Sequence, residues 1–202
     1  MSKIKFTKGE LKKQRDVLKQ YQRYLPTLQL KKQQLQIELL RHLAFLEEKQ
    51  QSAGVKKEAA EIWAGLFTDG QINLRPWLRP KRTVLGSKNI AGVDLPVFER
   101  LEFDPAEYDL FTASLWVDTA IEALRVIVSL REEIAVIEKG IQILRQELRV
   151  TAQRVNLFEK VKIPQAQENI RLIKIYVGDQ MTNAVGRSKI AKKKIEALEA
   201  QL

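Results

Sequence analysis

The sequence predicts a mainly α fold, a long antiparallel two-helix coiled coil formed by the N- and C-terminal helices, with a small head containing a short β-hairpin. Three observations lead to this expectation. Apolar residues recur with a seven-residue period over two long segments. The stretch between those segments loses the period and holds four of the six prolines. Charged residues make up 30% of the chain and aromatic residues only 7%, which is typical of an elongated helical protein.

The first helix is predicted to begin at Thr7, because Glu10 three residues later allows each side chain to cap a backbone amide of the other residue. Pro26 predicts a kink near Tyr24 rather than a stop, since the repeat resumes at once. The predicted seam of this helix comprises Leu11, Leu18, Leu25, Lys32, Leu39 and Leu46, with Gln14, Tyr21, Leu28, Leu35 and His42 three residues after the first five.

The end of this helix is predicted between Ala64 and Thr68. Gly65 and the pair Asp69-Gly70 interrupt the pattern there, and glycine is common just beyond a helix end. We therefore expect three regions, an N-terminal coiled-coil helix at 1–66, a head with a β-hairpin at 67–112 and a C-terminal coiled-coil helix at 113–202.

The head contains two stretches of loosely alternating polarity, Arg82–Ser87 and Val93–Arg100, joined by Asn89–Gly92. This pattern predicts a β-hairpin with Trp77 and Phe98 as a minimal core. A hairpin of two strands is marginally stable alone, so we expect it to pack against the helices or against a partner.

The second helix is predicted to begin between Pro105 and Asp109 and has the clearer repeat, with seven heptads whose seam positions are all apolar or Thr. Pro164 interrupts the repeat, and beyond it the spacing is closer to 3.6 than to 3.5, so we expect a kinked helix that continues to the C-terminus. The seam comprises Ala113, Ala120, Ile127, Ile134, Ile141, Leu148 and Val155, with Trp116, Ala123, Leu130, Ile137, Leu144, Thr151 and Phe158; the later stripe comprises Ile170, Ile173, Val177, Met181, Ala184, Ser188, Ala191, Ile195, Leu198 and Leu202.

Positive charge gathers at both ends of the chain. Residues 1–24 carry eight Lys or Arg and two acidic residues, and residues 187–202 carry five and two, so the ends account for +9 of the net +10. Antiparallel pairing brings these ends together, and the resulting basic tip would attract acidic proteins, nucleic acid or anionic lipid.

The composition argues against catalysis. Without cysteine there is no disulfide, thiolate nucleophile or cysteine-ligated metal, and the single histidine, His42, sits at a seam position where a structural role is expected. No phosphate-binding loop, dinucleotide turn or serine elbow is present. No apolar run approaches the roughly 20 residues that span a bilayer. We expect no catalytic residue, metal or cofactor, and a protein suited to a reducing cytoplasm.

The block Arg154–Pro164, with its Arg-Val-Asn start and Ile-Pro end, followed by Asn169–Ile173, resembles the C-terminal helix of the D subunit of the rotary V/A-type ATPases. The N-terminal stretch Thr7–Leu35 and the hairpin segment Asn89–Pro96 are similar to the same family, so the resemblance covers nearly the whole chain.

The resemblance implies a central rotor shaft that transmits torque and lies peripheral to the membrane in the cytoplasm. Its paired termini would insert into the ring of catalytic and regulatory A and B subunits, its head would bind the small F subunit of the stalk, and its lower end would sit on the funnel-shaped C/d subunit of the membrane rotor. Candidate ring contacts are Arg15, Arg23, Arg187, Lys189, Lys192, Lys193 and Lys194; the candidate head contacts, expected to be exposed apolar groups, are Leu74, Trp77, Leu78, Val97 and Phe98.

Two other interpretations remain open from the residues alone. A basic helical hairpin can bind RNA phosphates, but that use predicts basic residues along one face with aromatic residues between them, whereas here the charge is concentrated at the ends. A coiled-coil scaffold or stalk without rotation also fits the repeat. The resemblance favours the rotor shaft, for which no nucleic-acid partner is expected.

Overall fold

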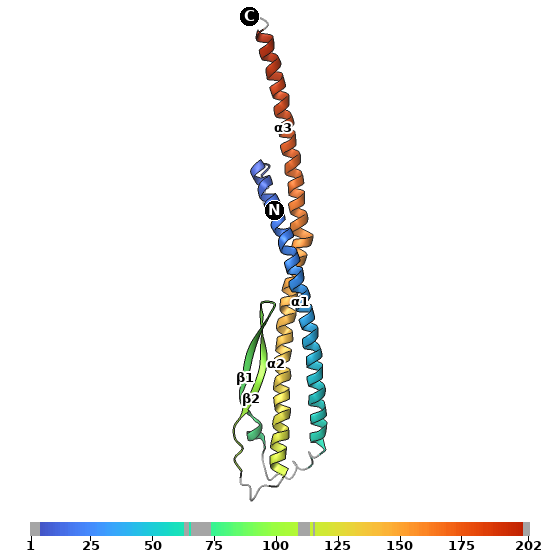
Figure 1. Cartoon of the computed structure of the whole chain (residues 1–202), viewed down its shortest axis with the longest axis vertical. Helices are drawn as coiled ribbons and strands as arrows, with labels where there is room; N and C mark the ends of the chain where they lie inside the picture. The colour runs from blue at the N-terminus through green and yellow to red at the C-terminus, as the bar shows by residue number, and fades with distance from the viewer. Residues whose placement is uncertain (1–4, 63–64, 66–73, 109–113, 115, 200–202) are drawn as a thin grey trace. The chain divides into compact units, whose positions relative to one another are not determined.

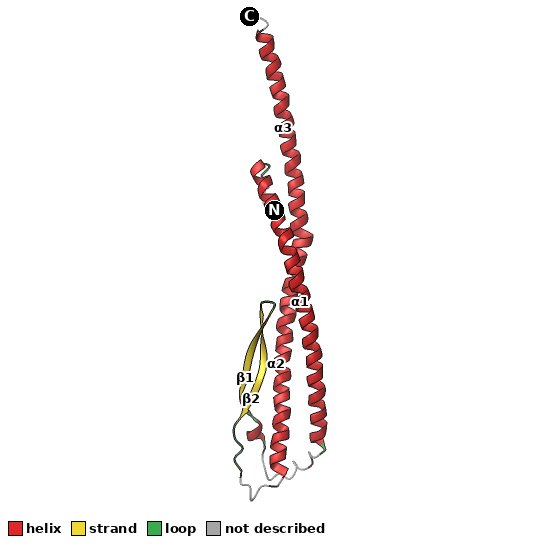
Figure 2. Cartoon of the chain, viewed as in Figure 1, coloured by secondary structure: helices red, strands yellow, loops and turns green. Residues whose placement is uncertain are grey.

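The computed structural model describes residues 5–62, 65, 74–108, 114 and 116–199, which are mainly helical with one β-hairpin (Figure 1, Figure 2). Two compact units are present, unit 1 with Met1–Leu30 and Thr151–Leu202, and unit 2 with Lys31–Val150. In each unit the N-terminal helix pairs antiparallel with the C-terminal helical segment, which confirms the predicted fold class. In chain order the elements are α1 (Lys8–Glu61), the 3-10 helix η2 (Arg75–Leu78), β1 (Pro80–Ile90), β2 (Val93–Phe103), α2 (Trp116–Leu157), the π-helical turn η3 (Phe158–Lys162) and α3 (Ile163–Glu199).

The start of α1 is set by the Thr7 side chain. Its Oγ1 accepts a hydrogen bond from the Glu10 backbone N–H at 3.2 Å, so Thr7 is the N-cap as predicted. The Glu10 carboxylate accepts a bond from the Gln14 amide at 2.9 Å instead of closing the reciprocal half of the predicted capping box. α1 then continues through Pro26, as the resumed repeat predicted.

In unit 2, α1 pairs antiparallel with α2. Two interhelical ion pairs fix this direction, with 3.0 Å between Lys31 Nζ and Glu147 Oε1 and 2.8 Å between Lys49 Nζ and Glu133 Oε1. Every described seam residue predicted between Leu11 and Phe158, in either unit, is buried or half-buried, which confirms the seven-residue period. His42 is one of them, and its Nδ1 is buried without a hydrogen-bond partner in the described part of the chain.

The β-hairpin of unit 2 packs on this helix pair. Leu95 of β2 is 1% exposed and contacts Leu35 of α1 and Leu144 of α2, which are both fully buried. Ile90 and Val93, next to the turn, pack against the same cluster. The expectation that the hairpin packs against the helices or a partner is confirmed for the helices.

The turn of the hairpin is shorter than predicted. The strands extend to Ile90 and from Val93, so the loop is Ala91-Gly92 and not Asn89–Gly92. Both loop residues have positive φ angles, 52° and 77°, as in the type I′ turns that suit the twist of a hairpin. The Asn89 side chain supports this turn, since its Oδ1 accepts from the Gly92 N–H at 3.1 Å.

The base of the head packs on the first turns of α2. The Trp77 ring lies 5.2 Å from the Tyr108 ring and covers a second buried cluster. Phe98 is half-buried and is not named in either cluster, so its predicted pairing with Trp77 stays a prediction. The second cluster comprises Leu74, Val117, Ala120 and Ile121.

Arg125 of α2 ties two segments of the head together. Its Nε donates to the Trp77 carbonyl at 3.2 Å and its Nη2 to the Asp104 carbonyl at 2.6 Å. Its guanidinium carbon also lies 5.0 Å from the centroid of the Phe103 ring. One cation therefore holds both η2 and the end of β2 against α2.

Both helix ends near the head differ from the prediction. Residues 104–108 are not helical, so the predicted start between Pro105 and Asp109 is wrong for its described residues, and α2 begins at Trp116. α1 ends at Glu61, earlier than predicted, while Asp69-Gly70 lies outside the described residues.

In unit 1, α1 pairs with the end of α2 and with α3. α2 passes into α3 through η3, where the Ile163 N–H donates to the Phe158 carbonyl five residues earlier. The interruption predicted at Pro164 thus takes the form of a π-turn just before it, and the helix continues to Glu199 as expected. The contacts between the helices include the rings of Phe6 and Tyr176 at 5.1 Å, Gln14 Oε1 and Asn169 Nδ2 at 3.3 Å, and the rings of Tyr21 and Phe158 at 5.1 Å.

Candidate functional site

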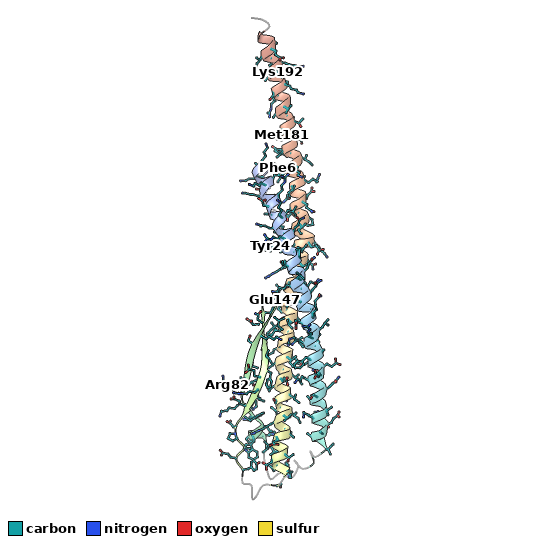
Figure 3. The ribbon with its side chains drawn as sticks, in the orientation of Figure 1. Phe6, Tyr24, Arg82, Glu147, Met181 and Lys192 are labelled. Carbon is teal, nitrogen blue, oxygen red and sulfur yellow. The ribbon has the colours of Figure 1, made fainter. Side chains whose placement is uncertain are left out.

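The end of α3 extends past its partner helix in unit 1. Among the described residues, the outermost ring contact with the N-terminal segment is that of Phe6 with Tyr176, and every residue from Gly178 to Ala197 is exposed. Figure 3 shows Met181 and Lys192 beyond the level of Phe6. At 1.5 Å per residue this stretch is roughly 30 Å long. We call residues 178–197 the exposed end of α3.

An apolar stripe continues onto this segment. Ile170 and Ile173 are buried against α1, whereas Met181 and Ile195, later members of the same predicted stripe, are each 56% exposed. The stripe lies in an i, i+3, i+4 pattern and presents one apolar face. Met181 and Ala184, at the start of this face, line a shallow groove with Phe6, and the described residues of this chain leave the rest of the face uncovered.

The predicted basic residues all lie in unit 1. Arg15 and Arg23 are exposed on α1, and the five others are exposed on the end of α3. Consecutive residues are about 100° apart on a helix, so Arg187 and Lys192–Lys194 surround the apolar stripe on several sides. Lys192 also lies 3.6 Å from Glu196 in an exposed ion pair. The arrangement suits a partner with acidic groups around an apolar contact.

The predicted head contacts are less exposed than expected. Leu74 is only 9% exposed and belongs to the buried cluster, so its expected exposure is wrong. Trp77, Leu78 and Phe98 are half-buried, and Val97 is 40% exposed. Their role in binding a partner stays a prediction.

An apolar groove in unit 2 was missed by the sequence analysis. It has a volume of about 550 Å³ and lies between α1 and α2, with Ile37 and Leu40 on its wall at 51% and 67% exposed. Both residues lie outside the predicted seam. A second apolar stripe on α1 could have identified them. In this stripe Leu30 and Ile37 are seven residues apart, the same spacing as in the predicted seam, and Leu40 follows three residues later.

Perturbed ionisable groups lie on the surface and not in a cleft. The Arg171 guanidinium donates to the Glu168 carboxylate at 2.7 and 2.8 Å and lowers the pKa of that carboxyl group. Asp104 lies 2.7 Å from Lys81 and raises the pKa of the lysine. Within the described ranges, no cluster of three potential metal ligands is found, and no helix is long and apolar enough to cross a bilayer.

Comparison with known proteins identifies the class. The family model for the D subunit of ATP synthase matches residues 10–193, so the chain belongs to this family. The V-type ATP synthase D subunit of Borreliella burgdorferi is 47% identical over 192 residues, covering 95% of each chain. The corresponding proteins of Chlamydia abortus and Chlamydia pneumoniae are 34% and 33% identical, each covering at least 95% of both chains. These matches favour the predicted family over the RNA-binding arm and the scaffold.

Proposed function

We propose that this chain is the central-stalk shaft of a rotary V/A-type ATP synthase and transmits torque between the nucleotide-binding ring and the membrane rotor. The observation that carries the proposal is the exposed end of α3, which combines an uncovered apolar stripe with five cations. A helix of this kind needs an enclosing partner, and a ring of subunits supplies one.

The asymmetry of unit 1 gives the coupling a physical basis. The apolar face of the exposed end points in one direction, so three equivalent interfaces of a ring would each meet different side chains at any instant. Nucleotide binding that favours one of these contacts favours one orientation of the shaft. Rotation and ATP turnover are then coupled by differential binding, with the nucleotide chemistry in the A and B subunits.

Unit 2 would carry the remaining contacts. The head would bind the small F subunit of the stalk, with Val97 as its most exposed predicted contact, and the lower end would sit on the funnel-shaped C/d subunit of the membrane rotor. The chain itself would be non-catalytic, cytoplasmic and peripheral to the membrane.

The test combines size-exclusion chromatography with ATPase assays on a purified hexamer of A and B subunits. We expect a one-to-one complex and altered ATPase activity when the chain is added. Removing residues 190–202 together with 1–15 should weaken binding at least about tenfold. Met181→Gln with Ile195→Gln tests the apolar stripe, and Val55→Gln in unit 2, at 66% exposure, is the matched control.

A second set of variants separates charge from apolar contact. Replacing Lys192, Lys193 and Lys194 by alanine should weaken binding strongly at low salt and less at high salt, because screening already removes their contribution there. Equal affinity of the truncated and intact chains for the hexamer would refute insertion of unit 1 into the ring.

A further inference from the structure

The coiled-coil repeat of unit 1 changes register across η3. Before the π-turn the seam runs through Thr151, Val155 and Phe158. Continuing the seven-residue period would place Gln165 and Leu172 in the seam, yet Gln165 is exposed and Leu172 is 37% exposed. Ala166 and Ile173 lie one position later and are 4% and 0% exposed. The period also places Asn169 in the seam; it is half-buried and donates to Gln14, but Ile170, one position later, is more deeply buried at 9% exposure.

A π-turn accounts for a shift of this size. Its hydrogen bond spans five residues instead of four, so it takes one more residue into the turn than an α-helix does. The bond from Ile163 N–H to the Phe158 carbonyl has this span. Glu159, Lys160 and Val161 are exposed, so the additional residue is accommodated on the solvent side and not in the seam.

Pro164 alone does not explain the π-turn, as a second proline in the same unit demonstrates. α1 passes through Pro26 without any change from α-helix. The seam of α1 also keeps its period there, with Leu25 before the proline and Leu28 after it both half-buried. Pro26 lies where the register does not change, and no π-turn accompanies it. Pro164 lies just after the register change, and the π-turn η3 precedes it.

We propose that residues 158–162 contain a one-residue insertion in the coiled-coil repeat, which the π-turn accommodates. This π-turn is a joint about which α3 can twist while its packing face stays on α1. The backbone bonds of this segment then open more readily than those of the helices on either side. The proposal concerns this chain alone and does not depend on the proposed function.

Three variants of the full chain test it by hydrogen exchange over residues 158–166 and by thermal unfolding. In Pro164→Ala the segment should keep amide exchange at least about tenfold faster than residues 166–173, because the register still demands the turn. Deleting Lys160 in that background should remove this difference and change Tm by no more than about 3 °C, since both seams are kept.

The matched control deletes Gln142 in the same background. This change moves every seam residue between the deletion and η3 out of register and should lower Tm by at least about 10 °C. Slow exchange in Pro164→Ala alone would overturn the proposal, because the proline would then be the cause. So would a deletion of Lys160 that is as damaging as the deletion of Gln142, or that prevents folding. The displaced residues are Leu144, Leu148, Thr151, Val155 and Phe158.

Discussion

Units 1 and 2 contain the same antiparallel pairing but support it differently. In unit 2 the pair is covered by the hairpin, so Leu144 is enclosed by residues of three elements, and ion pairs such as Lys49 with Glu133 join the two helices. In unit 1 the described residues join the helices to each other by aromatic and amide contacts, and α3 is exposed from Gly178 to Ala197. A third layer therefore distinguishes unit 2, where the helix pair is covered by the hairpin, from the end of unit 1, where the described residues leave an apolar stripe exposed.

The largest expected effect tests that third layer. Leu144→Ala removes a fully buried side chain between α1 and β2 and should destabilise the chain by about 3 kcal/mol, since a cavity adds to the lost burial. Ile143→Ala, at a 39% exposed neighbour, should cost less than about 1 kcal/mol. Chemical denaturation measures both values. Equal costs would mean that the three-layer packing contributes no additional stability.

The next effect concerns the attachment of the head to α2. Arg125→Ala removes the donors to the Trp77 and Asp104 carbonyls and should destabilise the head by about 2 kcal/mol. Hydrogen exchange should rise in residues 75–78 and 101–104 and stay unchanged in α3. Arg131→Ala, an exposed site on the same helix, is the control. Unchanged exchange in the head would show that the buried cluster alone holds it.

The sequence predicts local features of both units more reliably than contacts between distant segments. The seam residues from Leu11 to Phe158 and the Thr7 cap follow from spacings of three, four or seven residues, and those that the structure describes were found where expected. The burial of Leu95 depends on Leu35 and Leu144, which are far away in the sequence, so the pattern within β2 alone could not identify Leu95 as the residue that packs on the helix pair.

The π-turn is an intermediate case. The changed spacing after Pro164 was visible in the sequence, but the proline offered a simpler explanation and concealed a shift of one residue. Comparing the polar residue at an extrapolated seam position, such as Gln165, with the apolar residue beside it, Ala166, would have revealed it. The exposure of Met181 could not be predicted by this comparison, because the apolar stripe of one helix does not show how far the partner helix extends along it.

The smallest effect tests whether surface ion pairs contribute to unit 1. Glu168 has a pKa lowered from the usual 4.5 by the hydrogen bonds from Arg171, so the pair contributes stability above the ordinary pKa and loses it as pH falls through the lowered one. Carbon NMR titration from about pH 6 to about pH 2 should show a lower Glu168 midpoint in the wild type than in Arg171→Gln.

The pair joins two exposed side chains three residues apart on α3, so Arg171→Gln should barely change Tm. An unchanged Glu168 midpoint in this variant would contradict the hydrogen-bonded geometry. A large fall in Tm would contradict the view that unit 1 depends on its seam, because an exposed pair within α3 would then support helix pairing as the interhelical pairs of unit 2 do.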